Sequence, residues 1–193
     1  IDHEVGRILA TLDETGQADN TLVIFMSDHG EMLGDHGIYF KGPHFYDEAV
    51  RVPLVLRLPG VFEGGEIRDG LVELIDLAPT MLEVAGVEAP PHRLQGKSLT
   101  DPQFKREHVF SEYYNSWTHG DAYGSMLRTA DEKIVIYHGT GQGEYYDLRE
   151  DPDEFTNRFK DPECSERVRA LMQQCFDASV FTMDPGPERE GPF

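Results

Sequence analysis

The chain has 193 residues, which is enough for one or two domains with an apolar core. Its 36 acidic residues outnumber its 17 lysines and arginines, and the formal net charge is −19. A surface of this sign repels nucleic acid and anionic membranes, so we expect neither as a partner. Because no run of about 18 apolar residues occurs, no transmembrane helix is expected. The compartment stays open between the cytoplasm and a periplasmic or secreted location.

Helices and strands alternate in the first hundred residues. The predicted elements are a helix that starts at Ile1 and ends at Gly16, a strand over 21–27, a loop over 28–50, a strand over 53–58 and a helix from Asp76 to Ala85. The unbroken apolar run in the first strand is typical of a sheet covered on both faces. We expect a short helix near Glu48, and Asp76 as the cap of the last helix.

The second half of the chain predicts a small antiparallel sheet with a helix on it. Strands are expected over 108–113, 125–129, 133–137 and 143–148, and a helix over 163–177. One apolar stripe of this helix comprises Cys164, Val168, Leu171, Met172, Cys175 and Phe176. At ~1.5 Å per residue the two cysteines lie about 16 Å apart, too far for a mutual disulfide. The tail over 184–193 is predicted to be mobile.

The loop after the first strand contains candidate metal-binding and anion-binding residues. The apolar run over 22–26 leads to Asp28 and His29, which supply a hard oxygen and a nitrogen donor. Such a pair suits calcium, magnesium, manganese or zinc, and two ligands do not choose among them. Lys41 is a permanent positive charge suited to an oxyanion, and His44 could donate to the same anion or protonate a leaving oxygen. On spacing alone, a helix cap and a loop histidine remain an alternative for the Asp-His pair.

Four motifs follow one another in a characteristic order. They are SDHGEMLGDHG over 27–37, YDEAVRVPL over 46–54, DLAPT over 76–80 and YDLREDPDEFTN over 146–157. Together they resemble the type I sulfatase family of the alkaline phosphatase superfamily. Lys41 matches the sulfate-binding lysine of that family, and the segment 2–9 resembles the helix before the strand.

The resemblance implies a fold and a site. The fold would be α/β, an alkaline phosphatase-like sheet flanked by helices over 1–100, then a small antiparallel sheet with a packed helix over 101–183. Asp28 and His29 would bind a divalent metal, most simply calcium, with acidic residues from a missing N-terminal segment. The metal would hold the sulfate oxygens and activate the nucleophile. Lys41 and His44 would bind the sulfate and act in catalysis.

The early motifs of the family have no match here. These are an acidic pair of metal ligands and C-x-P-x-R or S-x-P-x-R, whose Cys or Ser matures to the formylglycine nucleophile. Cys164 begins C-S-E-R-V and Cys175 begins C-F-D-A-S, so neither fits. We therefore interpret the chain as the C-terminal portion of a longer sulfatase, inactive alone, that acts on a sulfated small molecule or carbohydrate. A phosphonate monoester or phosphodiester hydrolase of the same superfamily and a non-catalytic binding or scaffold fragment remain alternatives.

Overall fold

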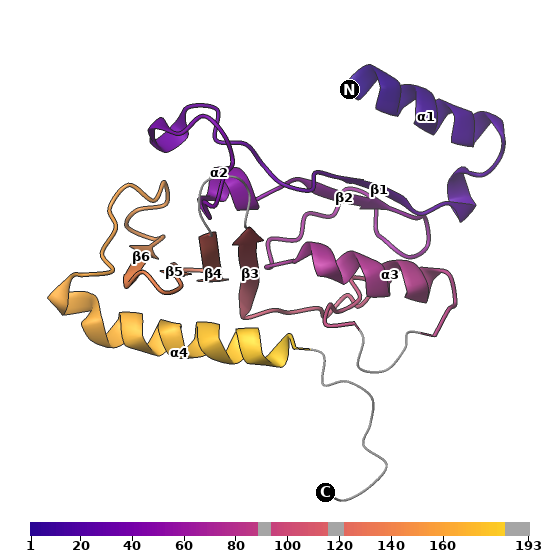
Figure 1. Ribbon diagram of the computed structural model, residues 1–193. Coiled ribbons are helices and arrows are strands. Elements are labelled where there is room, and N and C mark those ends of the chain that lie inside the picture. The colour runs from indigo at the N-terminus through magenta and orange to yellow at the C-terminus, as the bar shows by residue number, and fades with distance from the viewer. Residues whose placement is uncertain (89–93, 116–121, 184–193) are drawn as a thin grey trace, which may run out of the picture.

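Two antiparallel sheets form the centre of the protein (Figure 1). The computed structural model describes residues 1–88, 94–115 and 122–183. The smaller sheet pairs β1 (Val23–Met26) with β2 (Leu54–Arg57). The larger sheet has the order β3 (His108–Asn115), β4 (Ala122–Thr129), β5 (Glu132–Tyr137), β6 (Gln142–Asp147). The predicted strands are confirmed, and the expected tail over 184–193 lies outside the described residues.

The helices surround these sheets. They are α1 (Asp2–Glu14), α2 (Asp47–Val50), α3 (Leu77–Val84) and α4 (Ser165–Phe181). Short 3-10 turns precede or link them at Ala18–Asn20, Asp35–Gly37, Leu74–Asp76 and Pro162–Cys164. The α/β class and the order of elements agree with the sequence analysis. No helix in the described parts of the chain is long and apolar enough to cross a membrane.

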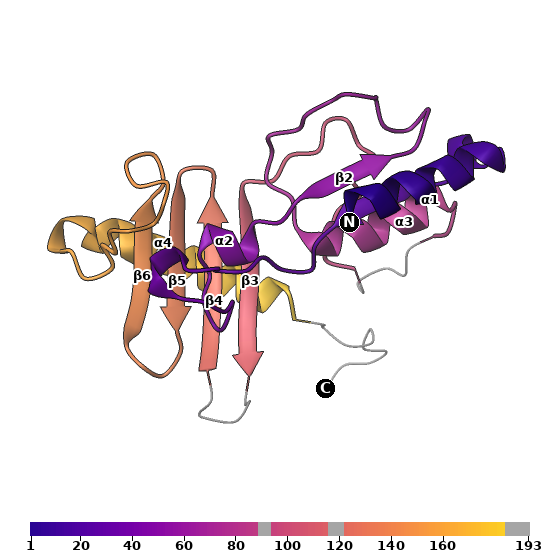
Figure 2. The same cartoon turned by 90° about the horizontal axis from the view of Figure 1, so that it is seen from above.

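One face of the larger sheet packs on α4, as predicted (Figures 1 and 2). Leu127 and Ile134 are register partners on neighbouring strands, and both are fully buried. The helix meets them with Cys164, Val168, Leu171 and Cys175, and both cysteines are free and buried. The predicted stripe is wrong at Met172 and Phe176, which are 37% and 63% exposed. Each follows a buried residue directly, and a step of one residue turns the helix about 100° away from the sheet.

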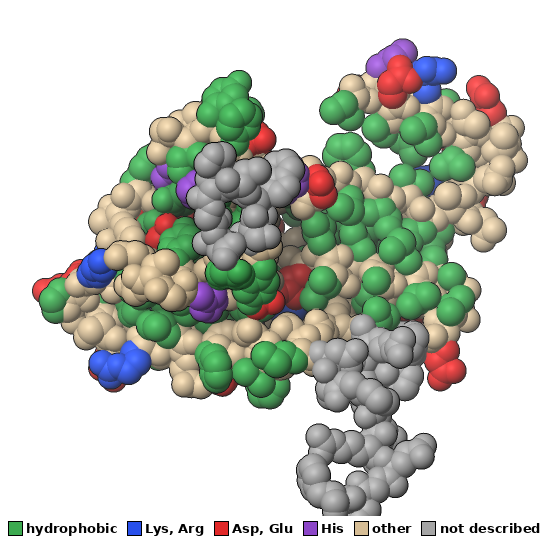
Figure 3. All heavy atoms as spheres, in the orientation of Figure 1, with side chains coloured by type: hydrophobic (Ala, Val, Ile, Leu, Met, Phe, Trp, Pro, Cys, Tyr) green, Lys and Arg blue, Asp and Glu red, His purple; other side chains and the backbone are tan. Residues whose placement is uncertain are grey.

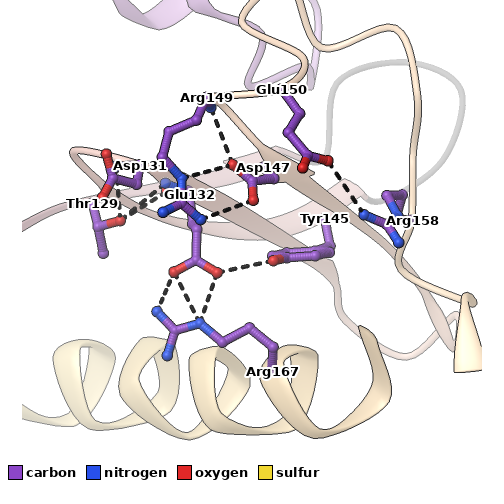
Figure 4. Close-up of polar contacts among 9 residues, drawn as sticks. All are labelled: Thr129, Asp131, Glu132, Tyr145, Asp147, Arg149, Glu150, Arg158 and Arg167. Atoms are coloured by element: carbon purple, nitrogen blue, oxygen red, sulfur yellow. Dashed lines mark hydrogen bonds and ion pairs between the residues drawn. The ribbon is translucent and has the colours of Figure 1, made fainter. Parts of the chain in front are cut away.

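An ion pair fixes α4 along the sheet (Figure 4). The Arg167 guanidinium donates from Nε to both carboxylate oxygens of Glu132, at 2.7 and 2.9 Å. Tyr145 Oη donates to the same carboxylate at 2.9 Å. The hydrogen bond from Arg167 lowers the pKa of Glu132 against the effect of burial. A lowered folded-state pKa stabilises the protein above the unfolded glutamate pKa of about 4.3, and this contribution is lost as the pH falls further.

The other face of the larger sheet packs on the segment that leads into α2 (Figure 2). Phe45 is 3% exposed and packs on Met126 and Val135. Gly124 lies directly beneath its ring, because a Cβ at this glycine would come within 2.7 Å of the Phe45 Cε2 atom. The larger sheet is therefore covered on one face by α4 and on the other by the loop that holds the candidate site.

The smaller sheet is less covered than its sequence predicts. Phe25, Met26 and Val55 are 40%, 37% and 57% exposed. Figure 3 shows hydrophobic side chains gathered over β1, β2 and α3. The expectation of burial on both faces is wrong for the described residues, because among their elements β1 and β2 make extensive contacts only with each other.

A buried carboxylate joins α3 to the larger sheet. Asp76 is fully buried, yet its side chain does not cap α3 as predicted. It accepts instead from the amides of Glu73 and Lys97, at 2.9 and 2.8 Å, and from the guanidinium of Arg106. Arg106 also pairs with Glu73 at 2.5 Å, and Glu73 accepts from the amide of Phe110 on β3. The partners of the Asp76 carboxylate come from three segments of the chain, around Glu73, Lys97 and Arg106, so the cluster holds these segments together.

The two sheets lie on either side of residue 100, and the Arg106 cluster, formed with Glu73 and Asp76, joins the turn before α3 to β3 of the larger sheet. The division of the chain into domains over 1–100 and 101–183 stays a prediction.

The Arg106 cluster generates a stability prediction. Replacing Arg106 with Met leaves Asp76 and Glu73 buried without their cation, which typically costs about 3–5 kcal/mol. We expect a loss of that order in the free energy of unfolding, measured by urea denaturation. Arg7→Met is the matched control, because its pair with Glu4 is 68% and 61% exposed and such pairs contribute about 0–1 kcal/mol. Equal losses in the two variants would contradict a structural role for the cluster.

Candidate functional site

The chain turns sharply where β1 ends. Ser27 Oγ donates to the carbonyl of His29 at 2.8 Å, and the His29 amide donates to Asp28 Oδ1 at 3.1 Å. Gly30 then donates its amide to the carbonyl of Ala49 at 2.8 Å. A Cβ at Gly30 would overlap the carbonyl oxygen of Glu48, so only glycine allows this approach. The strand end is thereby held against α2, and the intervening loop is closed at its base.

Asp28 and His29 present their donors side by side. His29 Nδ1 lies 2.8 Å from the carbonyl oxygen of Gly30, which can only accept, so Nδ1 carries the hydrogen. The lone pair of Nε2 is therefore free, as a metal ligand requires. Nε2 lies 3.6 Å from Asp28 Oδ2, and the two side chains are 41% and 82% exposed. An oxygen and a nitrogen donor are thus accessible at one point of the surface.

A cation already lies at this point. The ammonium of Lys41 contacts Nε2 of His29, the same atom that would be needed to ligate a metal ion. The arrangement fits a divalent cation bound by Asp28 and His29. The part of the chain that the structure describes has no group of three or more His, Cys, Asp or Glu residues that could hold a metal. These two residues therefore provide only part of a coordination shell.

His44 lies apart from the other three candidates. Among the described residues, no hydrogen bond or ion pair joins it to Asp28, His29 or Lys41. Its ring stacks at 6.2 Å from the ring of Tyr46. Burial lowers the pKa of His44, which outweighs the opposing charge of Glu144. A neutral imidazole can donate a hydrogen bond without carrying a charge.

His36 supports the loop. Its backbone is in the left-handed region with φ of 53°, and its ring stacks on Tyr46 at 3.8 Å with Phe155 beyond. Its side chain is 9% exposed, and Nε2 lies 3.8 Å from Glu48. This packing gives His36 a structural role in shaping the loop.

The sequence analysis missed a buried charge cluster beneath the site. Lys133 on β5 is fully buried, and its ammonium lies 2.9 Å from the carbonyl oxygen of Phe45. It also pairs with Asp47 at 2.6 Å and with Glu154 at 2.5 Å. Burial would raise the pKa of Asp47, but Lys133 and Arg128 outweigh this effect and lower it. The site loop is therefore bound ionically to the larger sheet.

Strand alternation could have revealed this cluster. Residues 133, 135 and 137 share one face of β5, and Val135 on that face is fully buried. A lysine in phase with buried apolar residues predicts a buried ammonium that needs acceptors. Its acceptors, however, come from distant segments and leave no local pattern.

A protein-family model matches residues 34–180, which is most of the chain. Its description is N-sulphoglucosamine sulphohydrolase, C-terminal. The match includes Lys41, His44 and the whole larger sheet with α4.

Curated relatives agree with this match. An arylsulfatase of Clostridium perfringens is 35% identical over 89% of this chain and 36% of its own length. An N-acetylglucosamine-6-O-sulfatase of Bacteroides thetaiotaomicron is 30% identical over 98% of the chain and 36% of its own length. A multifunctional alkaline phosphatase superfamily protein of Trinickia caryophylli is 36% identical over 90% of the chain and 37% of its own length. The chain thus spans a little over a third of each relative.

Solved structures share the fold. One is a protein in complex with its substrate D-glucosamine-2-N,6-O-disulfate, with a TM-score of 0.85 and 31% identity over 98% of this chain and 40% of that one. Another is a phosphonate monoester hydrolase of Silicibacter pomeroyi, with a TM-score of 0.86 and 31% identity; the match covers 95% of this chain and 39% of the hydrolase. From its motifs, its fold and these similarities, the chain belongs to the sulfatase family of the alkaline phosphatase superfamily and corresponds to the C-terminal region described by the N-sulphoglucosamine sulphohydrolase model.

Proposed function

We propose that this chain is the C-terminal part of a metal-dependent sulfatase that hydrolyses sulfate esters of carbohydrates or other small molecules. The observation that carries the proposal is the meeting of Asp28, His29 and Lys41 at one accessible point. Two metal donors beside an exposed positive charge suit a tetrahedral oxyanion. The relatives that act on sulfated sugars support the substrate class.

Asp28 and His29 would hold the divalent ion, most simply calcium, through Oδ2 and Nε2. Manganese, magnesium and zinc accept the same donors. When bound, the ion would supply positive charge to the sulfate oxygens and to the nucleophile. The remaining ligands and the formylglycine nucleophile would come from a segment that precedes this chain in the full-length protein.

Lys41 would change partners when the site fills. Its ammonium contacts the same Nε2 atom that a metal requires, and two cations cannot share that lone pair. The side chain would therefore move from His29 to a sulfate or bridging oxygen, where negative charge develops in the transition state. His44 would donate a hydrogen bond to the same group or to the leaving oxygen.

A phosphonate monoester or phosphodiester hydrolase is the second candidate, favoured by the structural match to a phosphonate monoester hydrolase. Sulfate and phosphonate esters both need a metal and cations, so Asp28, His29 and Lys41 serve either. Comparison of kcat/KM for sulfate, phosphonate and phosphodiester substrates in the full-length protein separates the two enzymes. A non-catalytic binding fragment would bind metal without any turnover, which metal titration beside the same assays would reveal.

The isolated chain is expected to be inactive. It provides two metal ligands and no candidate nucleophile, so it should bind calcium weakly and should not turn over an aryl sulfate. The measurements are calorimetric titration with calcium and an aryl sulfatase assay of the purified 193 residues. Robust turnover by the pure chain would contradict the proposal that a preceding segment supplies the nucleophile and the remaining metal ligands.

The ligand pair can be tested in the full-length protein. Asp28→Ala should abolish activity with loss of bound metal, and Asp28→Asn and His29→Ala should each lower metal occupancy more than thermal stability, because both side chains are exposed to solvent. Elemental analysis measures occupancy, and thermal unfolding measures stability. Asp177→Asn, an exposed change on α4, is the control and should retain full occupancy. Full metal occupancy in all three ligand variants would overturn the assignment.

Lys41 can be separated from a structural lysine by kinetics. Lys41→Ala should lower kcat/KM by about 10²–10³, the effect of losing one preorganised charge-stabilising donor. Lys41→Arg should rescue only in part, because a planar guanidinium does not replace a compact ammonium. The melting temperature should hardly change, since Lys41 is exposed.

Lys160→Ala is the matched control, because this exposed lysine donates to Gln142 on β6, an edge strand of the larger sheet. Its kcat/KM should match that of the native protein. Normal kinetics in Lys41→Ala would show that Lys41 is merely a solvated loop residue.

A further inference from the structure

Lys133 is removed from water and surrounded by oxygen atoms from distant parts of the chain. Its side chain is fully buried on β5. The ammonium donates to the Phe45 carbonyl oxygen at 2.9 Å and to Asp47 Oδ1 at 2.6 Å, and it forms an ion pair with Glu154 Oε1 at 2.5 Å. Both hydrogen-bond acceptors belong to the segment that leads from Lys41 into α2. The buried ammonium is therefore a direct contact between the sheet and the site loop.

Glu154 binds the same segment from a second direction. Its Oε2 accepts the backbone amide of Asp47 at 2.8 Å, while Oε1 faces Lys133. The residue is 2% exposed and adopts φ of 57°, a left-handed conformation that costs a non-glycine residue about 1–3 kcal/mol. The surrounding turn maintains this conformation, because Asp151 accepts the amides of Phe155 and Thr156.

These contacts act on main-chain atoms on both sides of Tyr46. Lys133 holds the carbonyl of Phe45, and Glu154 holds the amide of Asp47. The Phe45 ring is meanwhile fixed between Met126 and Val135. His44 directly precedes the segment held in this way, and Lys41 lies within one short turn of it.

The cluster contains two positive and two negative side chains, and each charge is compensated by the others. Lys133 and Arg128 face Asp47 and Glu154, with Arg128 Nη2 at 3.3 Å from Asp47 Oδ2. Removing one member leaves an uncompensated buried charge, whereas removing an opposite pair leaves a neutral set. Removing one charge of each sign should therefore weaken the cluster without unfolding the protein.

We propose that Lys133 and Glu154 are positioning residues, which hold Phe45–Asp47 on the sheet and thereby place His44 and Lys41 against the substrate anion. The expected loss of kcat rests on the proposed function. The attachment of Phe45–Asp47 to the sheet does not. Looser placement weakens contacts that matter most in the transition state, so kcat should fall more than KM rises.

The test uses the double variant Lys133→Met/Glu154→Gln in the full-length protein. It removes one charge of each sign, leaves Asp47 with Arg128 and Arg51, and keeps an amide oxygen near the Asp47 N–H. We expect a folded protein with faster amide hydrogen exchange over residues 41–47. We also expect kcat about tenfold to hundredfold lower, with a much smaller change in KM.

The matched control makes the same two types of substitution at an ion pair on the opposite face of β5. Arg167→Met/Glu132→Gln removes the ion pair between α4 and the sheet and keeps an acceptor for Tyr145 (Figure 4). Among the described residues, no hydrogen bond or ion pair joins Arg167 or Glu132 to Phe45–Asp47. In this control, kcat and amide hydrogen exchange over 41–47 should stay native.

Three results would overturn the inference. They are native exchange over 41–47 in the folded Lys133/Glu154 variant, native kcat in that variant, and an equal loss of kcat in the control. Kinetics are measured with the ester that the native protein hydrolyses best. If the native protein hydrolyses no sulfate ester, the proposed function fails separately, and the exchange comparison still decides whether Lys133 and Glu154 hold the segment.

Discussion

A buried ammonium needs acceptor and anionic oxygen atoms in place of water, and Lys133 obtains them only when distant parts of the chain meet. Its partners come from the segment before α2, from α2 itself and from the turn that follows β6. The larger sheet therefore cannot bury Lys133 unless the site loop lies across it. This requirement couples the folding of the C-terminal sheet to the shape of a loop that begins at the end of β1, on the other sheet.

The distribution of charge is consistent with an anionic ligand. Acidic residues outnumber basic ones about two to one, and Lys133 and Arg106 are bound to carboxylates. In the described parts of the chain, Lys41 has no carboxylate within ion-pair distance, and its polar contact is the imidazole of His29. An exposed ammonium that is not neutralised locally creates a positive point on a negative surface. Such a point attracts a small oxyanion, while the remaining surface discourages polyanions.

The sequence predicted most of the elements because strands and helices leave local periodic patterns. The strands of the larger sheet and α4 illustrate this, and so does the adjacency of Asp28 and His29. Errors arose where burial depends on partners far away in the chain. Phe25 and Phe176 are apolar but exposed, and Asp76 does not cap α3 but accepts from Lys97, which lies far along the chain. The proximity of Lys41 to His29 was suggested by motif resemblance, whereas no sequence pattern connects Lys133 to Glu154.

The sheet holds the site segment by main-chain atoms, through the carbonyl of Phe45 and the amide of Asp47. Main-chain groups are the same for almost every amino acid, so this attachment does not depend on the side chains at positions 44 and 46. A change of side chain at either position therefore removes neither of these two main-chain hydrogen bonds. The larger sheet can in this way fix the course of the backbone independently of the chemistry that the adjacent side chains supply.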